Sequence, residues 1–124
     1  MAKINSHRDL TVWQKAMDLA VQTYRRTSKF PSNETYRLVS QATQAAASVP
    51  TNIAEGYARA TKKDYANFLA IAKGSLMETE TFLMLAIRLG YLTHTEATGA
   101  LGLITEVSKM LTVLRTRLLA LAAS

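Results

Sequence analysis

The sequence of 124 residues predicts an all-α protein, an antiparallel up-and-down four-helix bundle that forms one domain over residues 1–124. Three observations predict this fold. Only 2 prolines and 5 glycines interrupt the chain, apolar residues recur three or four positions apart, and the connections are short enough to join antiparallel neighbours. We expect helices at about 9–28, 34–57, 62–89 and 95–122.

The first predicted helix, 9–28, carries an apolar stripe that we expect to face the core. Its members are Leu10, Trp13, Met17, Ala20, Val21 and Tyr24. The helix ends in "RRTSK", where cations stabilise the negative end of the helix dipole. The stretch "KFPSNE" then forms a loop, in which Ser32 or Asn33 is expected to cap the next helix.

The second predicted helix, 34–57, has a seam of mostly small residues, so another helix can approach it closely. The seam comprises Leu38, Ala42, Ala45, Val49, Asn52 and Gly56. Pro50 lies inside this helix. Because proline lacks a backbone N–H, the Ala46 carbonyl should lose its helical partner, and we expect a kink or break at Pro50.

The third predicted helix, 62–89, begins where Thr61 and Asp64 resemble a capping box. It shows two neighbouring apolar stripes, which imply more than one partner helix. The first stripe is Tyr65, Leu69, Ala72, Leu76, Thr79, Leu83 and Ala86; the second is Phe68, Ile71, Ser75, Glu78, Phe82, Leu85 and Leu89.

Gly90 is expected to end the third helix, and the fourth, 95–122, begins near Thr93 or Thr95. The fourth helix has the most regular seam, formed by Ala100, Ile104, Val107, Leu111, Leu114, Leu118 and Leu121. Leu103, Met110 and Val113 lie beside that seam. They either face a neighbouring subunit or widen the band that faces the core.

Composition limits the classes of function. The chain has no cysteine, which excludes disulfides, thiolate metal sites and cysteine nucleophiles. It has neither an apolar signal segment nor a run of about 18 uncharged apolar residues, so we expect a cytoplasmic protein without a membrane span. The net charge of +6 favours polyanionic partners.

We expect no catalytic residues, metal ion or cofactor. A di-iron bundle needs Glu-x-x-His motifs, and neither His7 nor His94 follows a glutamate by three residues. No Ser or Thr shares a helical face with a histidine that could activate it. The sequence also lacks a glycine-rich loop that would hold phosphate.

A strip of polar residues borders the seam of the second helix, and it has two interpretations. The strip comprises Gln41, Ser48, Asn52, Glu55 and Arg59. Either Asn52, Glu55, Ser75 and Glu78 form a structural hydrogen-bonded network that sets the helix register, or they make a functional contact. An unpaired buried carboxylate is costly, so Glu78 should meet Asn52, Ser48 or Arg59. The Ser48 or Asn52 side chain can also satisfy the backbone groups freed by Pro50.

Two groups of cations are candidates for contacts with nucleic-acid phosphates. The first is Arg59, Lys62 and Lys63, to which Lys73 can be added, and the second is Arg25, Arg26 and Lys29. Lys62 and Lys63 oppose the dipole at a helix N-terminus, which invites a functional explanation. The alternative is that both groups are ordinary solvated surface.

Several segments resemble the family of four-helix-bundle proteins of the 23S ribosomal RNA intervening sequence, over about 10–119. The specific pieces are "VWQKA", "NIAEG" and "GSLMETE", supported by "LGYL". The resemblance implies an antiparallel bundle that assembles as a ring-like homopentamer. It also implies a relation to the accessory proteins of diversity-generating retroelements, which bind nucleic acid through basic surfaces while accompanying a reverse transcriptase.

The family motif falls on Asn52 to Gly56, Arg59, Gly74 to Leu76, Glu78 and Glu80, which resemble a structural signature more than a catalytic set. The sequence departs from the pattern at three residues. Thr43 and Gln44 stand where the family commonly has arginines, and Arg37 replaces a glycine. The two lost cations weaken the expectation of nucleic-acid affinity.

We therefore expect a non-enzymatic, homo-oligomeric bundle that binds RNA or DNA weakly through exposed Lys and Arg. The alternative is an interaction scaffold that docks a partner protein and has no role with nucleic acid. In that case the basic residues only maintain solubility.

Overall fold

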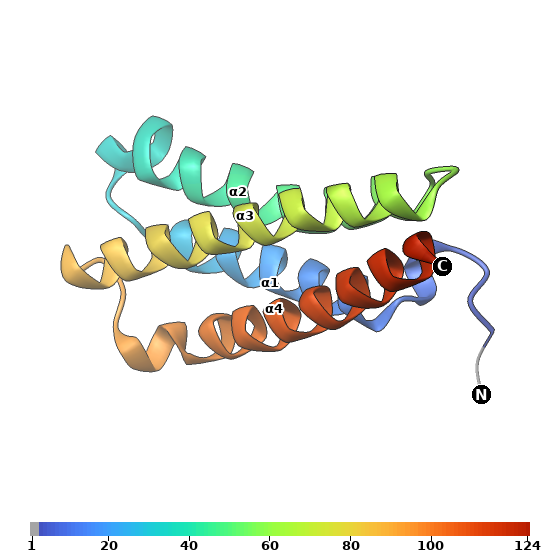
Figure 1. Cartoon of the computed structure of the whole chain (residues 1–124). Coiled ribbons are helices and arrows are strands. Elements are labelled where there is room, and N and C mark those ends of the chain that lie inside the picture. The colour runs from blue at the N-terminus through green and yellow to red at the C-terminus, as the bar shows by residue number, and fades with distance from the viewer. Residues whose placement is uncertain (1–2) are drawn as a thin grey trace.

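The computed structural model describes residues 3–124, and over that range it contains four α-helices and no strand. They are α1 (Thr11–Thr27), α2 (Ser40–Tyr57), α3 (Lys62–Arg88) and α4 (His94–Ala123). The helices alternate in direction, and each packs against its neighbours in sequence, while α1 also packs against α4 (Figure 1). The predicted all-α, up-and-down four-helix bundle is confirmed.

Short helical turns lead into α1 and α2. A 3-10 turn, η1 (His7–Asp9), precedes α1, and a 3-10 turn, η2 (Ser32–Glu34), continues into a π-helical segment, η3 (Thr35–Val39). Neither Ser32 nor Asn33 caps α2 through its side chain, so that prediction is wrong. The irregular backbone lies at Arg37, with φ −117° and ψ −105°.

The connection from α3 to α4 follows standard capping rules at both helix ends. Gly90 has φ +81°, the Tyr91 N–H donates to the Ala86 carbonyl at 3.0 Å, and the Gly90 N–H donates to the Ile87 carbonyl at 3.0 Å. This is a Schellman motif, for which glycine is the preferred residue. Thr93 and Glu96 then form a reciprocal capping box at the start of α4.

Most residues of three predicted seams lie in the core: the seam of α2, the first stripe of α3 and the seam of α4. The most deeply buried large side chains of α3 and α4, at most 1% exposed, are Leu69, Leu76, Leu83, Ile104 and Leu111. The stripe predicted for α1 is only partly confirmed, because Ala20 is buried and Leu10 and Trp13 pack against the core, but the other three members do not. Met17, Val21 and Tyr24 are exposed, whereas the buried residues of α1 are Val12, Ala16, Leu19, Ala20, Thr23 and Thr27.

Two threonines explain why the buried face of α1 differs from the apolar stripe. The Thr23 hydroxyl donates to the Leu19 carbonyl and the Thr27 hydroxyl to the Thr23 carbonyl, both at 2.8 Å. With its hydroxyl satisfied by the preceding turn, a threonine can be buried without an unpaired polar group. Met17, Val21 and Tyr24 are consequently left on the outside.

Helix α2 passes through Pro50 without a break, because the helix extends over Ser40–Tyr57. At its C-terminal end it approaches α3 closely at Gly56. A Cβ atom added there would lie 2.9 Å from Phe68 Cβ and 3.2 Å from the Tyr65 carbonyl oxygen. The close approach predicted from the small residues of this helix is therefore present at Gly56.

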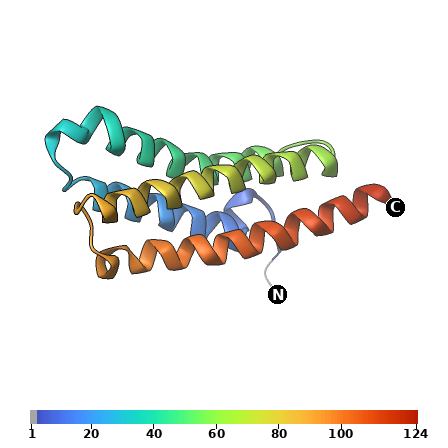
Figure 2. The ribbon, with the colours of Figure 1, turned by 60° about the vertical axis from the view of Figure 1, so that its left-hand side comes forward.

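Helix α4 extends beyond the other three helices at its C-terminal end (Figure 2). Leu119 and Leu121 are exposed there. Among the described helices, α4 alone is long and apolar enough to cross a membrane by length and composition. Its seam residues Ala100, Ile104 and Val107 pack in the core, as expected for a core helix of a bundle.

Candidate nucleic-acid interface

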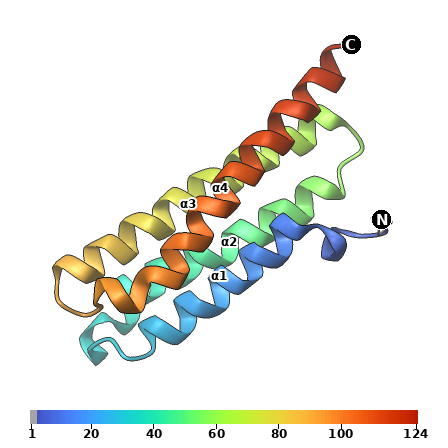
Figure 3. The ribbon, with the colours of Figure 1, turned by 90° about the horizontal axis from the view of Figure 1, so that it is seen from below.

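The bundle places the predicted phosphate-binding cations at three separate locations. Arg25 and Arg26 lie at the end of α1, whereas Arg59, Lys62 and Lys63 flank the α2–α3 connection at the opposite end (Figure 3). Because α3 has 27 residues, these ends are about 40 Å apart at 1.5 Å per residue. Lys73 lies between them on α3 and faces α4.

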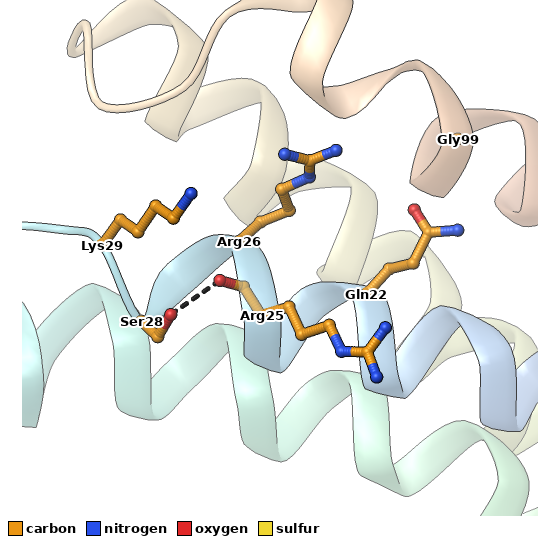
Figure 4. Close-up of a pocket in the computed structure, with 6 residues that line it drawn as sticks. All are labelled: Gln22, Arg25, Arg26, Ser28, Lys29 and Gly99. Carbon is orange, nitrogen blue, oxygen red and sulfur yellow. Dashed lines mark hydrogen bonds between the residues drawn. The ribbon is translucent and has the colours of Figure 1, made fainter.

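The cations at the end of α1 line an open cavity of about 720 Å³. Its wall, which we call the Arg26 pocket, comprises Gln22, Arg25, Arg26, Ser28, Lys29 and Gly99 (Figure 4). The side chains of Gln22 and Arg26 extend toward the turn of α4 that carries Gly99, and the Arg25 side chain extends in a different direction, along α1 (Figure 4). Helix α1 and the first turns of α4 thus form the pocket together.

Local spacing and one glycine build this pocket. Gln22, Arg26 and Lys29 are separated by four and three residues, which places them on one face of α1 and the turn that follows it. At Gly99, a Cβ atom would lie 2.8 Å from Gln22 Oε1. The absence of a side chain at Gly99 therefore allows the Gln22 amide to lie against α4.

The cations of the Arg26 pocket lack carboxylate partners at ion-pair distance. Residues 3–124 contain three ion pairs, Lys15–Glu106, Arg37–Glu34 and Arg59–Glu55. The nearby Glu96 carboxylate instead accepts hydrogen bonds from the Thr93 N–H at 3.0 Å and the Thr93 hydroxyl at 3.1 Å. The donors of Arg26 and Lys29 therefore remain available to a ligand.

The positive charge of the pocket affects Glu96. The hydrogen bond from the Thr93 backbone N–H holds the pKa of Glu96 below its usual value, with further contributions from the Thr93 hydroxyl and from the charges of Arg26 and Lys29. Arg25 and Arg26 also stabilise the negative end of the α1 dipole. If Arg25 and Arg26 served only to stabilise α1, however, they would not need to line a concave wall together with α4.

The cations at the opposite end are more strongly engaged within the chain. Arg59 lies 3.7 Å from Glu55 and 4.4 Å from the centre of the Phe68 ring. Such an exposed ion pair contributes about 0.5 kcal/mol. Lys62 and Lys63 are exposed in the first turn of α3. This end presents two exposed lysines and a partly engaged arginine.

The predicted polar network is smaller than expected. Ser48 and Ser75 share a hydrogen bond of 2.8 Å, and Asn52 Nδ2 donates to the Ser48 carbonyl at 2.8 Å and to Ser48 Oγ at 2.9 Å. Glu55 lies outside this group, paired with Arg59. Ser75 is buried, so the bond from Ser48 satisfies it across the α2–α3 contact.

Two expectations for this region are wrong. Glu78 is exposed and makes no hydrogen bond or ion pair within residues 3–124, because it lies on the outer part of the second stripe of α3, with the exposed Ile71 and Leu85. The Asn52 side chain donates to the carbonyl of Ser48 and not to that of Ala46. In the same range, no group of three His, Asp or Glu side chains is arranged to hold a metal ion.

Three important residues escaped sequence analysis. Gln22 and Gly99 belong to the Arg26 pocket, but only the contact between α1 and α4 brings them together. Glu34 is 6% exposed and accepts a hydrogen bond of 2.8 Å from the Tyr91 hydroxyl. The spacing of Gln22 from Arg26 was a usable signal, whereas neither Gly99 nor Glu34 lies in a local pattern that indicates its role.

Comparison with known proteins agrees with this fold. The sequence model of a family described as 23S rRNA-intervening sequence protein matches residues 8–113. A crystal structure of a protein with unknown function from the S23 ribosomal protein family, from Bacteroides thetaiotaomicron, is similar with a TM-score of 0.76 and 26% sequence identity. The similarity covers 85% of this chain and 98% of that chain. No curated protein matches the sequence.

Proposed function

Because the chain belongs to the 23S rRNA-intervening sequence protein family, we propose that it is a non-enzymatic, homo-oligomeric protein of the cytoplasm that binds nucleic-acid phosphates at the Arg26 pocket. The observation that carries this proposal is the concave wall of Arg25, Arg26 and Lys29, none of which belongs to an ion pair of the described chain. Unpaired cations in a concave surface concentrate positive potential where a phosphate can bind.

The chemistry of the wall suits a phosphodiester backbone. Arginine can donate two parallel hydrogen bonds to phosphate oxygens, lysine contributes a mobile point charge, and the Gln22 amide adds a neutral donor. Such contacts position a nucleic acid without reading its bases, so we expect weak binding with little sequence preference. The net charge of +6 favours the same class of partner.

Fluorescence anisotropy with a labelled RNA hairpin, measured across a NaCl series, tests this function. Because counterions are released from the phosphates, the affinity should fall linearly on a log–log plot as salt increases. We expect the triple variant Arg25→Ala/Arg26→Ala/Lys29→Ala to lose most of the affinity. The matched variant Arg59→Ala/Lys62→Ala/Lys63→Ala removes the same charge at the other end and should lose less.

The result can contradict the proposal in two ways. Absence of binding by the wild-type protein at low salt would remove the nucleic-acid function. Equal losses from the two triple variants would show that only total charge matters and that the Arg26 pocket is not the site. Circular dichroism of each variant verifies that the helices are intact.

Two exposed apolar faces support the homo-oligomer. One lies on α1 and comprises Met17, Val21 and Tyr24, and the other is the outer part of the second α3 stripe, Ile71, Leu85 and Leu89; all six are at least 39% exposed. The α1 face borders a groove lined by α2 residues, and Leu85 and Leu89 border a separate groove between η3, α2 and α3. Contacts between two different faces generate a closed ring when the rotation between subunits closes, and a ring of five copies, a homopentamer, is the assembly that we propose.

The same apolar faces favour a second candidate function, a scaffold that docks a different protein. In that case a single protein partner should be recovered with the tagged chain before and after nuclease treatment. Loss of all recovered material after nuclease treatment would favour the nucleic-acid function instead.

A further inference from the structure

The groove between α3 and α4 contains a second group of cations, distinct from the Arg26 pocket. Lys73 on α3 and Arg115 on α4 both line a cavity of about 280 Å³. Its wall, which we call the Lys73 groove, also includes Leu69, Ala70, Gly74, Met77, Leu111, Thr112 and Thr116. None of these lining residues, all within 3–124, is acidic.

Both cations are held in place by one hydrogen bond each. Lys73 Nζ donates to Thr112 Oγ1 at 2.6 Å, and Arg115 Nε donates to the Ala66 carbonyl at 3.2 Å. A lysine ammonium has three donors and an arginine guanidinium has five. Within the described part of the chain, no carboxylate pairs with either residue, so most of their donors stay open to a ligand.

These charges lie at the edge of an apolar surface. Lys73 and Arg115 are half-buried as residues, the Lys73–Thr112 hydrogen bond is exposed, and the same groove is lined by Leu69 and Leu111, which are almost fully buried. Two like charges that line one groove without a counterion repel each other. An anion bound between them would reduce that repulsion.

The shape and chemistry of the groove select the ligand. Its volume is several times the roughly 30 Å³ occupied by one water molecule, yet below the range of about 300–1,000 Å³ for drug-sized ligands. The Thr112 and Thr116 hydroxyls add neutral hydrogen-bonding groups beside the cations. These features suit a compact oxyanion with several acceptor oxygens.

We propose that the Lys73 groove binds the phosphate group of a small ligand, with Lys73 and Arg115 as its charged contacts. This inference is independent of nucleic-acid binding at the Arg26 pocket. Thr112 and Gly99 are 13 residues apart on α4 by their numbering, which corresponds to about 20 Å along the helix. The proposal therefore gives Lys73 a role separate from nucleic-acid binding, for which the sequence analysis grouped it with Arg59, Lys62 and Lys63.

Two-dimensional ¹H–¹⁵N NMR with inorganic phosphate as the probe tests this site, with NaCl at matched ionic strength and pH as the reference. We expect saturable shifts of the Gly74 and Thr112 amide signals. Removing one charged hydrogen-bond donor should weaken binding about tenfold or more, so Lys73→Met and Arg115→Met should each reduce the affinity by that factor. Lys109→Met removes the same charge from another surface of α4 and should leave it unchanged.

The same titration with a short single-stranded RNA separates the two sources of phosphate. Saturable binding of inorganic phosphate that depends on Lys73 and Arg115 supports the proposal, whatever happens to RNA binding at the Arg26 pocket. Shifts with RNA only, equal weakening by Lys109→Met, or no shift with phosphate would each overturn it. If Arg115→Met fails to fold, the effect of Lys73→Met on phosphate affinity is the test of the site. Methionine has an apolar chain of similar length to that of lysine, so we expect this variant to fold.

Discussion

At the scale of single residues, Glu34 shows how the bundle uses a buried carboxylate. Glu34 precedes α2, is 6% exposed, and accepts a hydrogen bond of 2.8 Å from the hydroxyl of Tyr91, which follows α3. Arg37 Nε lies 3.6 Å from its other oxygen. The pair joins the two connections at one end of the molecule, and its geometry links segments 57 residues apart in the chain.

We predict that Tyr91→Phe lowers the free energy of unfolding, because it removes the hydrogen bond to the buried Glu34 carboxylate. Tyr36→Phe is the matched control, since Tyr36 is 93% exposed, and it should change stability by less than about 0.5 kcal/mol. Urea denaturation followed by circular dichroism measures both values. Similar small effects from the two variants would show that the Tyr91–Glu34 bond adds little.

The same bond makes stability depend on alkaline pH. The hydrogen bond to Glu34 is the main cause that raises the pKa of Tyr91 above its usual value of 10.0. A pKa that is higher in the folded state contributes stability that is present below pH 10 and is lost as pH rises through the folded value. The stability difference between wild type and Tyr91→Phe should therefore shrink above pH 10, and a difference that grows would contradict this assignment.

At the scale of elements, the contact between α2 and α3 depends on one close approach and one small polar network. Gly56 lies against Phe68 and Tyr65, and Ser48 shares its hydrogen bond with the buried Ser75 farther along the same contact. The first feature sets how near the helices come, and the second disfavours sliding of one helix along the other. The segment from Ser48 to Gly56 therefore has a packing role in the contact between α2 and α3.

Alanine substitutions at two helical glycines should have opposite effects on stability. Gly56→Ala places a Cβ 2.9 Å from Phe68 Cβ and should destabilise the protein by about 1–3 kcal/mol. Gly102→Ala, in α4, meets no atom within 4 Å and should stabilise it by about 0.5–1 kcal/mol through helix propensity. Thermal and urea unfolding of both variants test the signs, and stabilisation by Gly56→Ala would disprove the close approach.

At the scale of the whole molecule, the distribution of exposed apolar residues is the basis for the proposed self-association. Val21 is 43% exposed on α1 and Leu85 is 44% exposed on α3. Single exposed apolar residues are ordinary, whereas apolar stripes at helical spacing indicate a surface that becomes covered. Since the two stripes lie on different faces, self-association through them would be heterologous.

We predict that light scattering gives a mass several times the chain mass of 13.6 kDa. Val21→Glu and Leu85→Glu should each give monomers, because a charge buried in an apolar contact is costly. Thr105→Glu, on the exposed side of α4, should leave the assembly intact.

Mixing the two monomeric variants provides a sharper test of the proposed geometry. Each variant retains the face that the other has lost, so a heterologous contact should produce a complex of one copy of each. Monomers alone in the mixture would mean that the two faces do not meet each other. A wild-type mass near 13.6 kDa would remove the oligomer altogether.

Local sequence patterns were sufficient for the helices, for Gly90 as a helix end, and for the core faces of α3 and α4, because periodicity and capping depend on residues within a few positions of one another. They could not identify the buried face of α1, since Thr23 and Thr27 become suitable for the core only when their hydroxyls bond to the preceding turn. The exposure of Glu78, the Arg26 pocket, the Lys73 groove and the Glu34–Tyr91 bond depend on which helices lie beside one another. Contacts between residues far apart in the chain decide such features, and no local spacing contains that information.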